Sequence, residues 1–168
     1  AAEGGLGLTQ NAPGEGRTTM REYWNGQTLL TEKMPKWEGP REGEVPDLVV
    51  VSLGGNDYNH HRGHVPSDEE FEKAYGDFLM EIFTSYESIG GEDVKILNVC
   101  GQGSPAEAEY DPDNNRCSPC PRVEAAVEKF KDDNMDVYGD RTEYLFIPCD
   151  GSVVNDDNDI GCGGHKNR

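Results

Sequence analysis

The segment that most constrains the fold is residues 48–53, Leu-Val-Val-Val-Ser-Leu, a nearly unbroken apolar run rich in β-branched residues. A run without regular polar alternation predicts a strand that is buried on both faces, as in a parallel sheet covered by helices. Gly54-Gly55 closes the run and predicts a sharp turn. Segments 94–99 and 143–147 have a similar character, so we expect them to form two further strands.

Helical patterns alternate with these strands. Ser67 and Glu70 predict a capping box, and the apolar residues between Phe71 and Tyr86 recur at three- to four-residue spacing. We interpret this stripe as core packing rather than as a cofactor site. A second helix is expected near residues 121–131, and a short one within residues 18–30. The alternation of strands and helices predicts a single α/β domain built on a parallel sheet.

The charge of the chain disfavours two classes of partner. Thirty-three acidic residues against 15 basic ones leave a net charge of -18, which repels nucleic-acid phosphates and anionic lipid surfaces. Only 34% of the residues are apolar, and no stretch approaches the roughly 20 apolar residues of a membrane-spanning helix. We therefore expect neither a nucleic-acid partner nor a membrane partner.

The cysteine content favours an oxidising, extracellular location. The five cysteines are Cys100, Cys117, Cys120, Cys149 and Cys162. The C-x-x-C at 117–120 lacks the second pair or nearby histidine of a zinc site, so structural disulfides are the preferred interpretation. Cys149 and Cys162 are candidates to clamp the loop between them, and Cys100 is a candidate partner of Cys117 or Cys120. The odd count leaves one thiol free, or bonded to a group outside this sequence.

Two polar residues are candidates for chemistry. Asn56 follows the Gly54-Gly55 turn, and His165 lies in a glycine-rich loop after the last expected strand. The carboxyl ends of parallel strands meet at one edge of a sheet, so we expect both residues on the same rim. An asparagine amide can donate to a developing oxyanion, and a neutral imidazole can act as a general base. Taken alone, Asn56 would be better explained as a turn cap and His165 as a surface histidine.

Together these segments resemble the SGNH (GDSL-type) hydrolases. Residues 46–57 are similar to the third conserved block of that family, a strand followed by Gly-x-Asn-Asp. Residues 161–167 resemble the histidine block of its carbohydrate acetyl-esterase branch, and residues 1–11 resemble the second block, which contributes an oxyanion-hole glycine. The resemblance implies a partial three-layer α/β/α flavodoxin-like fold with a parallel sheet over residues 1–168.

The resemblance also implies roles for particular residues. Gly5, through its backbone N–H, and Asn56, through its side-chain amide, would stabilise the oxyanion, and His165 would be the general base. Gly7 is the alternative to Gly5, because the Gly-x-Gly of this chain aligns with the family block in either register. The position three residues before the histidine, an aspartate in the family, is a cysteine here. Asp159 is the nearest acid that could orient the imidazole, and a backbone carbonyl is the alternative.

One block of the family is missing. None of the seven serines lies in the Gly-Asp-Ser context of the nucleophile, and no closing helix follows His165. We therefore expect a fragment that lacks the first strand and the closing helix, or a chain that pairs with a partner chain or upstream segment supplying the serine strand. Each buried backbone group left unpaired at the vacant strand edges would cost about 1–3 kcal/mol. The isolated chain is expected to be inactive.

The function predicted from these features is a secreted serine esterase that deacylates a carbohydrate, or a similar small acyl ester. The alternative is a non-catalytic SGNH-like domain with a structural or glycan-binding role in an extracellular assembly. No cofactor is expected, although the oxygen-rich loops 111–115 and 156–159 make Ca²⁺ an alternative. Trp24 and Trp37, with Tyr58, are candidates for a sugar-binding rim, and core packing is the favoured role for at least one of the two tryptophans.

Overall fold

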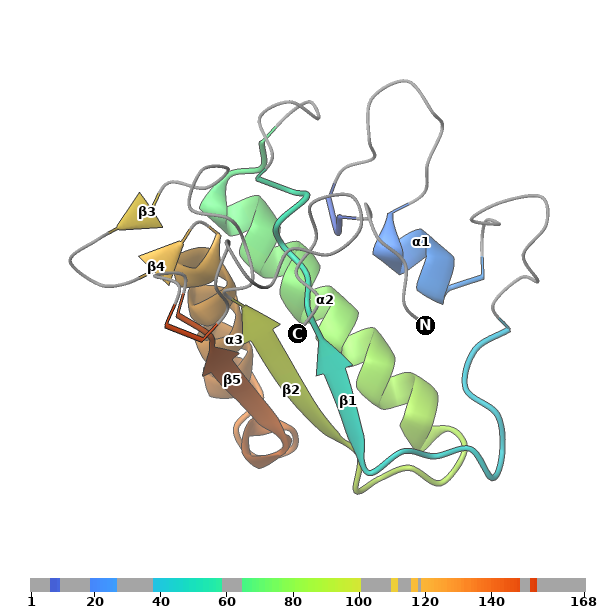
Figure 1. The fold of residues 1–168 in the computed structure, drawn as a ribbon. Helices are drawn as coiled ribbons and strands as arrows, with labels where there is room; N and C mark the ends of the chain where they lie inside the picture. The colour runs from blue at the N-terminus through green and yellow to red at the C-terminus, as the bar shows by residue number, and fades with distance from the viewer. Residues whose placement is uncertain are drawn as a thin grey trace.

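The computed structural model describes residues 7–9, 19–26, 38–58, 65–100, 110–111, 116–117, 119–148 and 152–153. Its elements follow the order α1 (Met20–Trp24), β1 (Leu48–Val51), α2 (Asp68–Glu87), β2 (Lys95–Cys100), β3 (Tyr110–Asp111), β4 (Arg116–Cys117), α3 (Cys120–Asp133), the 3₁₀ turn η2 (Gly139–Arg141) and β5 (Thr142–Phe146). Helices alternate with the three longer strands, as expected for the α/β class (Figure 1).

The three longer strands form the parallel sheet that the apolar runs predicted. Their order is β1-β2-β5, and both pairings are parallel. Val51 lies beside Asn98, and Asn98 lies beside Tyr144, so these three side chains share one face of the sheet. Strands β3 and β4 form a separate antiparallel pair that the sequence did not predict.

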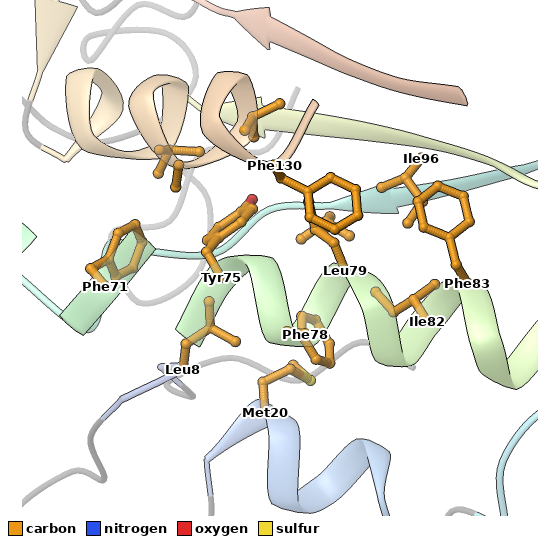
Figure 2. Packing of buried hydrophobic residues seen from close by; sticks show 14 of the residues in the cluster. Leu8, Met20, Phe71, Tyr75, Phe78, Leu79, Ile82, Phe83, Ile96 and Phe130 are labelled. Carbon is orange, nitrogen blue, oxygen red and sulfur yellow. The ribbon is translucent and has the colours of Figure 1, made fainter. Parts of the chain in front are cut away.

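The long helix α2 begins and packs as predicted. Ser67 accepts from the backbone N–H of Glu70, and the Glu70 carboxylate accepts from the N–H of Ser67, which completes the capping box. The apolar stripe is buried in the core, and its members are Phe71, Tyr75, Phe78, Leu79, Ile82, Phe83 and Tyr86. Figure 2 shows Leu8 and Met20 on one side of α2, with Ile96 and Phe130 on the other. The helix therefore joins the N-terminal segments to the sheet and to α3.

One polar residue of the sheet ties α2 to two strands. The side chain of Asn98 is fully buried in β2. It accepts a hydrogen bond from the hydroxyl of Tyr75 (3.1 Å) and donates one to the carbonyl oxygen of Glu143 (3.1 Å). A buried amide without partners would cost about 1–3 kcal/mol, so these bonds are what makes a polar residue tolerable here. The network specifies how α2 sits on the sheet.

One of the two predicted pairings of Cys100 is confirmed. Cys100, the last residue of β2, is disulfide-bonded to Cys120, the first residue of α3, with their Cα atoms 5.5 Å apart. The bond holds the start of α3 at the carboxyl end of the central strand. The predicted clamp between Cys149 and Cys162 lies outside the described residues.

Trp24 belongs to the core, as expected for at least one tryptophan, and so does Tyr58, which therefore does not line a sugar-binding rim. Each is only 8% exposed. Trp24 packs edge-on against Phe78, and the Tyr58 ring lies between Phe71 and the guanidinium of Arg122. Burial raises the pKa of the Tyr58 hydroxyl, and no hydrogen-bond partner for that hydroxyl lies in the described part of the chain. Trp37 lies outside the described residues.

The expectation that residues 48–53 are buried on both faces is wrong. Val51 is 5% exposed, but Leu48 and Val50 are 49% and 59% exposed, as is Leu145 of β5 at 46%. Successive side chains of a strand point to opposite faces, and α2 and α3 both cover the same face of the sheet (Figure 1). Within the described residues, no helix packs on the opposite face.

None of the described helices is both long and apolar enough to cross a membrane.

Two buried tyrosines provide a matched test of this core. We expect Tyr75→Phe to lower the free energy of unfolding by about 1–2 kcal/mol, because it leaves the Asn98 carbonyl without its donor. Tyr58→Phe removes a hydroxyl that has no partner among the described residues, so stability should be unchanged or slightly higher. Urea unfolding of both variants measures the difference. Equal losses in the two variants would contradict the network.

The disulfide has its own test. Closing a loop between residues 20 positions apart should stabilise the fold by about 3 kcal/mol, so Cys100→Ala/Cys120→Ala should lower the free energy of unfolding by that amount. Val137→Ala, at a side chain that is 59% exposed and lies outside the closed loop, is the control and should leave stability nearly unchanged. Peptide mapping without reduction checks the pairing directly. A Cys100–Cys117 peptide in the wild type would overturn it.

Candidate functional site

The candidate site begins with a glycine turn at the carboxyl end of β1. Gly54 has a φ of +111°, in the region that side chains rarely adopt. A Cβ atom there would lie 3.0 Å from Val123 Cγ2 and 3.3 Å from Phe71 Cζ. Glycine is therefore required both by the backbone conformation and by the close approach of α2 and α3. The turn is built into the core rather than attached to its surface.

The turn carries Asn56 to the edge of the sheet. The backbone N–H groups of Asp57 and Tyr58 both donate to the carbonyl oxygen of Gly54, at 3.1 and 3.3 Å. Asn56 is partly exposed between an exposed Gly55 and a buried Asp57. A Cβ added to Gly55 would meet no atom of the described residues within 4 Å. The predicted position of Asn56 on the rim is consistent with this geometry.

The most strongly bound side chain of the turn is Asp57, which the sequence reasoning had not singled out. Its side chain is fully buried. Its Oδ1 accepts from the backbone N–H groups of Leu8 (2.9 Å) and Thr9 (2.7 Å) and from the Thr9 hydroxyl (2.7 Å), and its Oδ2 lies 3.0 Å from the Leu8 nitrogen. Residues about 50 positions apart in the chain are thereby joined at one carboxylate.

This contact places the expected second block beside the third. Gly7 lies directly against the Asp57 carboxyl group, because a Cβ at Gly7 would stand 3.0 Å from Asp57 Cγ, Oδ1 and Oδ2. The carbonyl oxygen of Gly7 accepts from the N–H of Met20 at the start of α1 (2.8 Å). Of the two glycines proposed as backbone donors, Gly7 is the described one, and Gly5 lies outside the described residues.

The opposite side of the rim is formed by β2, β5 and α3. The N–H of Ile147, just past β5, donates to the carbonyl oxygen of Cys100 at the end of β2 (2.7 Å). The disulfide attaches Cys120 of α3 at the same point. All three parallel strands thus end beside the glycine turn, where sites of open α/β sheets form.

Several predicted site residues are not placed by the structure. His165 and Asp159 lie outside the described residues, as does most of the two oxygen-rich loops. Among the residues that the structure does describe, no group of three histidine, cysteine or acidic side chains is close enough to hold a metal ion. The described residues therefore form one half of a site, which consists of the Asn56 side-chain amide and the anchored backbone of residues 7–9.

This half-site has the parts needed to stabilise an anion. Asn56 has a side-chain N–H donor on the glycine turn. The N–H groups of Leu8 and Thr9 are bound to Asp57, which leaves the backbone N–H of Gly7 as the candidate donor of the anchored segment. Donors held in place before the reaction stabilise a developing oxyanion by about 3–4 kcal/mol each. Neither the Asn56 amide nor a backbone N–H is a nucleophile, so these groups can stabilise a developing negative charge but cannot attack an acyl carbon.

Comparison with known proteins supports the fold assignment. No protein-family model and no curated protein sequence matches the chain. Among solved structures, it is similar to an active-site mutant of a family two carbohydrate esterase from Clostridium thermocellum, with a TM-score of 0.58 and 22% identity. It is also similar to a carbohydrate esterase family 2 enzyme with a carbohydrate-binding domain from Corynascus thermopiles (Myceliophthora fergusii), with a TM-score of 0.63 and 18% identity.

These similarities cover most of this chain but less than half of the other proteins. The alignments span 88% and 96% of the present chain, against 38% and 44% of the two esterase chains. Carbohydrate esterases of family 2 are SGNH hydrolases. The resemblance to SGNH hydrolases is thus supported at the level of the fold: the chain is an α/β structure that shares the fold of these two esterases.

Proposed function

We propose that this chain forms part of a secreted serine esterase of the SGNH type that removes acyl groups from carbohydrate. The observation that carries the proposal is the joining of Gly7 and the Asn56 turn at the Asp57 carboxylate, which brings together the two donors that an oxyanion hole requires. The fold shared with family 2 carbohydrate esterases supports an ester substrate on a sugar. The cysteine content and the Cys100–Cys120 disulfide support secretion.

The proposed reaction assigns one step to each residue. A serine hydroxyl attacks the acyl carbon, and His165 accepts its proton as general base. The negative charge that develops on the acyl oxygen is stabilised by the Asn56 amide and by a backbone N–H of Gly7 or Gly5. His165 then returns the proton to the departing sugar oxygen. Water then attacks the acyl carbon of the acyl-serine while His165 accepts its proton, and the serine oxygen leaves as His165 returns that proton to it, which releases the free acid. Asp159 or a backbone carbonyl orients the imidazole.

The nucleophile must come from polypeptide other than these 168 residues. Strand β1 pairs only with β2 among the described strands, so its other edge is available to a further strand. The face opposite α2 and α3 exposes Leu48, Val50 and Leu145. Apolar side chains that gather on one face of a sheet, rather than standing singly, mark a surface that other protein covers. The net charge of -18 disfavours a second copy as the cover, so we assign this surface to the segment that carries the serine strand.

A second function is favoured by one observation, the lack of a Gly-Asp-Ser among these residues. If the covering segment has no serine at the corresponding position, the domain would bind glycan or serve as a structural component of an extracellular assembly. The esterase and this alternative share the same fold. They differ only in whether a serine reacts.

Probe labelling separates the two functions. We expect a fluorophosphonate to label the complete natural protein on a serine outside these 168 residues, and His165→Ala to abolish the labelling. Asn56→Ala should lower kcat for an acetylated sugar about a hundredfold to a thousandfold, because one oxyanion donor is lost. Asn25→Ala, at an exposed asparagine after α1, is the control. Absence of labelling in the wild type would favour the non-catalytic alternative.

The covering segment is tested by a pair of valines with equal exposure. Val50 on the bare face and Val137 after α3 are both 59% exposed. In the complete protein, Val50→Asp should reduce the free energy of unfolding by about 3 kcal/mol or more, since it would bury an unpaired carboxylate under the covering segment. Val137→Asp should have little effect. Similar, small effects of both substitutions would show that the bare face stays exposed.

A further inference from the structure

Asp57 is a buried carboxylate that accepts hydrogen bonds from a short segment distant in the sequence, residues 8 and 9. It is fully buried, and its two oxygens receive donors from Leu8 and Thr9 only 2.7–3.0 Å away. A carboxylate enclosed in this way and surrounded by donors is poorly placed to exchange a proton with a substrate. Its physical effect is to hold the backbone that donates to it.

That backbone is anchored at three points. The Asp57 carboxylate binds the N–H groups of Leu8 and Thr9, and the Met20 N–H binds the carbonyl of Gly7. The side chain of Leu8 is 4% exposed and packs beside α2 (Figure 2). Of these anchors, only Asp57 comes from the turn that carries Asn56. It alone therefore relates the position of the segment to that of the Asn56 amide.

We propose that Asp57 is a positioning residue of the ester-hydrolysing site: by binding the N–H groups of Leu8 and Thr9, it sets the backbone N–H of Gly7 against the Asn56 donor so that both face one oxygen. This proposal rests on the proposed function. Asp57 would not touch the substrate itself. It would act through the two groups that do, the Asn56 amide and the backbone N–H. The proposal also assigns a reason for glycine at position 7, where a Cβ would displace the carboxylate.

The chemistry requires a carboxylate at this position rather than an amide. A carboxylate is an acceptor on both oxygens, and hydrogen bonds to a charged acceptor are stronger than those between neutral groups. An asparagine would turn an NH₂ group toward N–H or O–H donors on one side. Asp57→Asn therefore keeps the size of the side chain and weakens its hold on the segment.

The test uses the complete protein and compares Asp57→Asn with Asp47→Asn, the same substitution at the opposite, exposed end of β1. We expect Asp57→Asn to lower kcat per titrated active site about tenfold to a hundredfold, with KM changed far less, because donors at the transition state are misplaced. Asp47→Asn should retain wild-type kcat. Hydrogen exchange at the Leu8 and Thr9 amides should accelerate in Asp57→Asn alone.

A milder pair of variants covers the case in which Asp57→Asn does not fold. Thr9→Val removes the hydroxyl donor and keeps the shape, whereas Thr9→Ser keeps the hydroxyl. We expect Thr9→Val to lower kcat and Thr9→Ser to retain it. A difference between these two variants in kcat, at equal melting temperature, cannot arise from loss of folded protein.

The outcomes separate this proposal from the function on which it rests. Wild-type turnover with unchanged kcat and unchanged amide exchange in Asp57→Asn, and with equal kcat in the two Thr9 variants, would overturn the positioning role alone. A complete protein that neither reacts with fluorophosphonate nor turns over an ester would overturn the proposed function and the catalytic role of Asp57 with it. Faster amide exchange at Leu8 and Thr9 without any change in kcat would also overturn the positioning role, because the hydrogen bonds of Asp57 to this segment would then serve only the stability of the fold.

Discussion

Burial of the apolar stripe of α2 is the interaction on which the other parts of the structure depend. Phe71, Tyr75, Leu79 and Phe83 are fully buried, and each such side chain stabilises the fold by about 1.5–3 kcal/mol. The ion pairs between Arg21 of α1 and the acidic residues of α2 are partly exposed and contribute less than about 1 kcal/mol each. The helix is therefore held mainly by its apolar contacts. Because it touches the sheet, α3 and the N-terminal segments at once, it sets their relative positions.

The candidate site follows from that packing. Phe71 at the start of α2 and Val123 at the start of α3 close on Gly54, which leaves room for no side chain there. The turn that results directs Asp57 inward, where it can bind the N-terminal segment, and leaves Asn56 at the open edge. Apolar packing thus determines the shape of the rim, and a few charge-assisted hydrogen bonds determine which backbone donors lie on it.

The bare face of the sheet connects the fold with the proposed function. The described helices cover one face, while Leu48, Val50 and Leu145 remain exposed on the other. The two carbohydrate esterases of similar fold are more than twice as long as the part that this chain matches. Under the proposed function, the same additional polypeptide would both cover this surface and bring the serine to the rim.

The sequence by itself determined the helices, the strands and the fold class. Capping residues, three-to-four spacing and apolar runs are local signals, so the helices at 68–87 and 120–133 and the three parallel strands could be predicted. The Gly-Gly-Asn-Asp motif indicated the rim and the SGNH-type fold.

Only the tertiary structure decided what packs against each helix and strand. Residues 48–53 looked buried on both sides because apolar character does not reveal what covers it, and Trp24 and Tyr58 proved to be core for the same reason. The role of Asp57 depends on a contact with Leu8 and Thr9, and a pairing between residues some 50 positions apart leaves no local pattern in the chain.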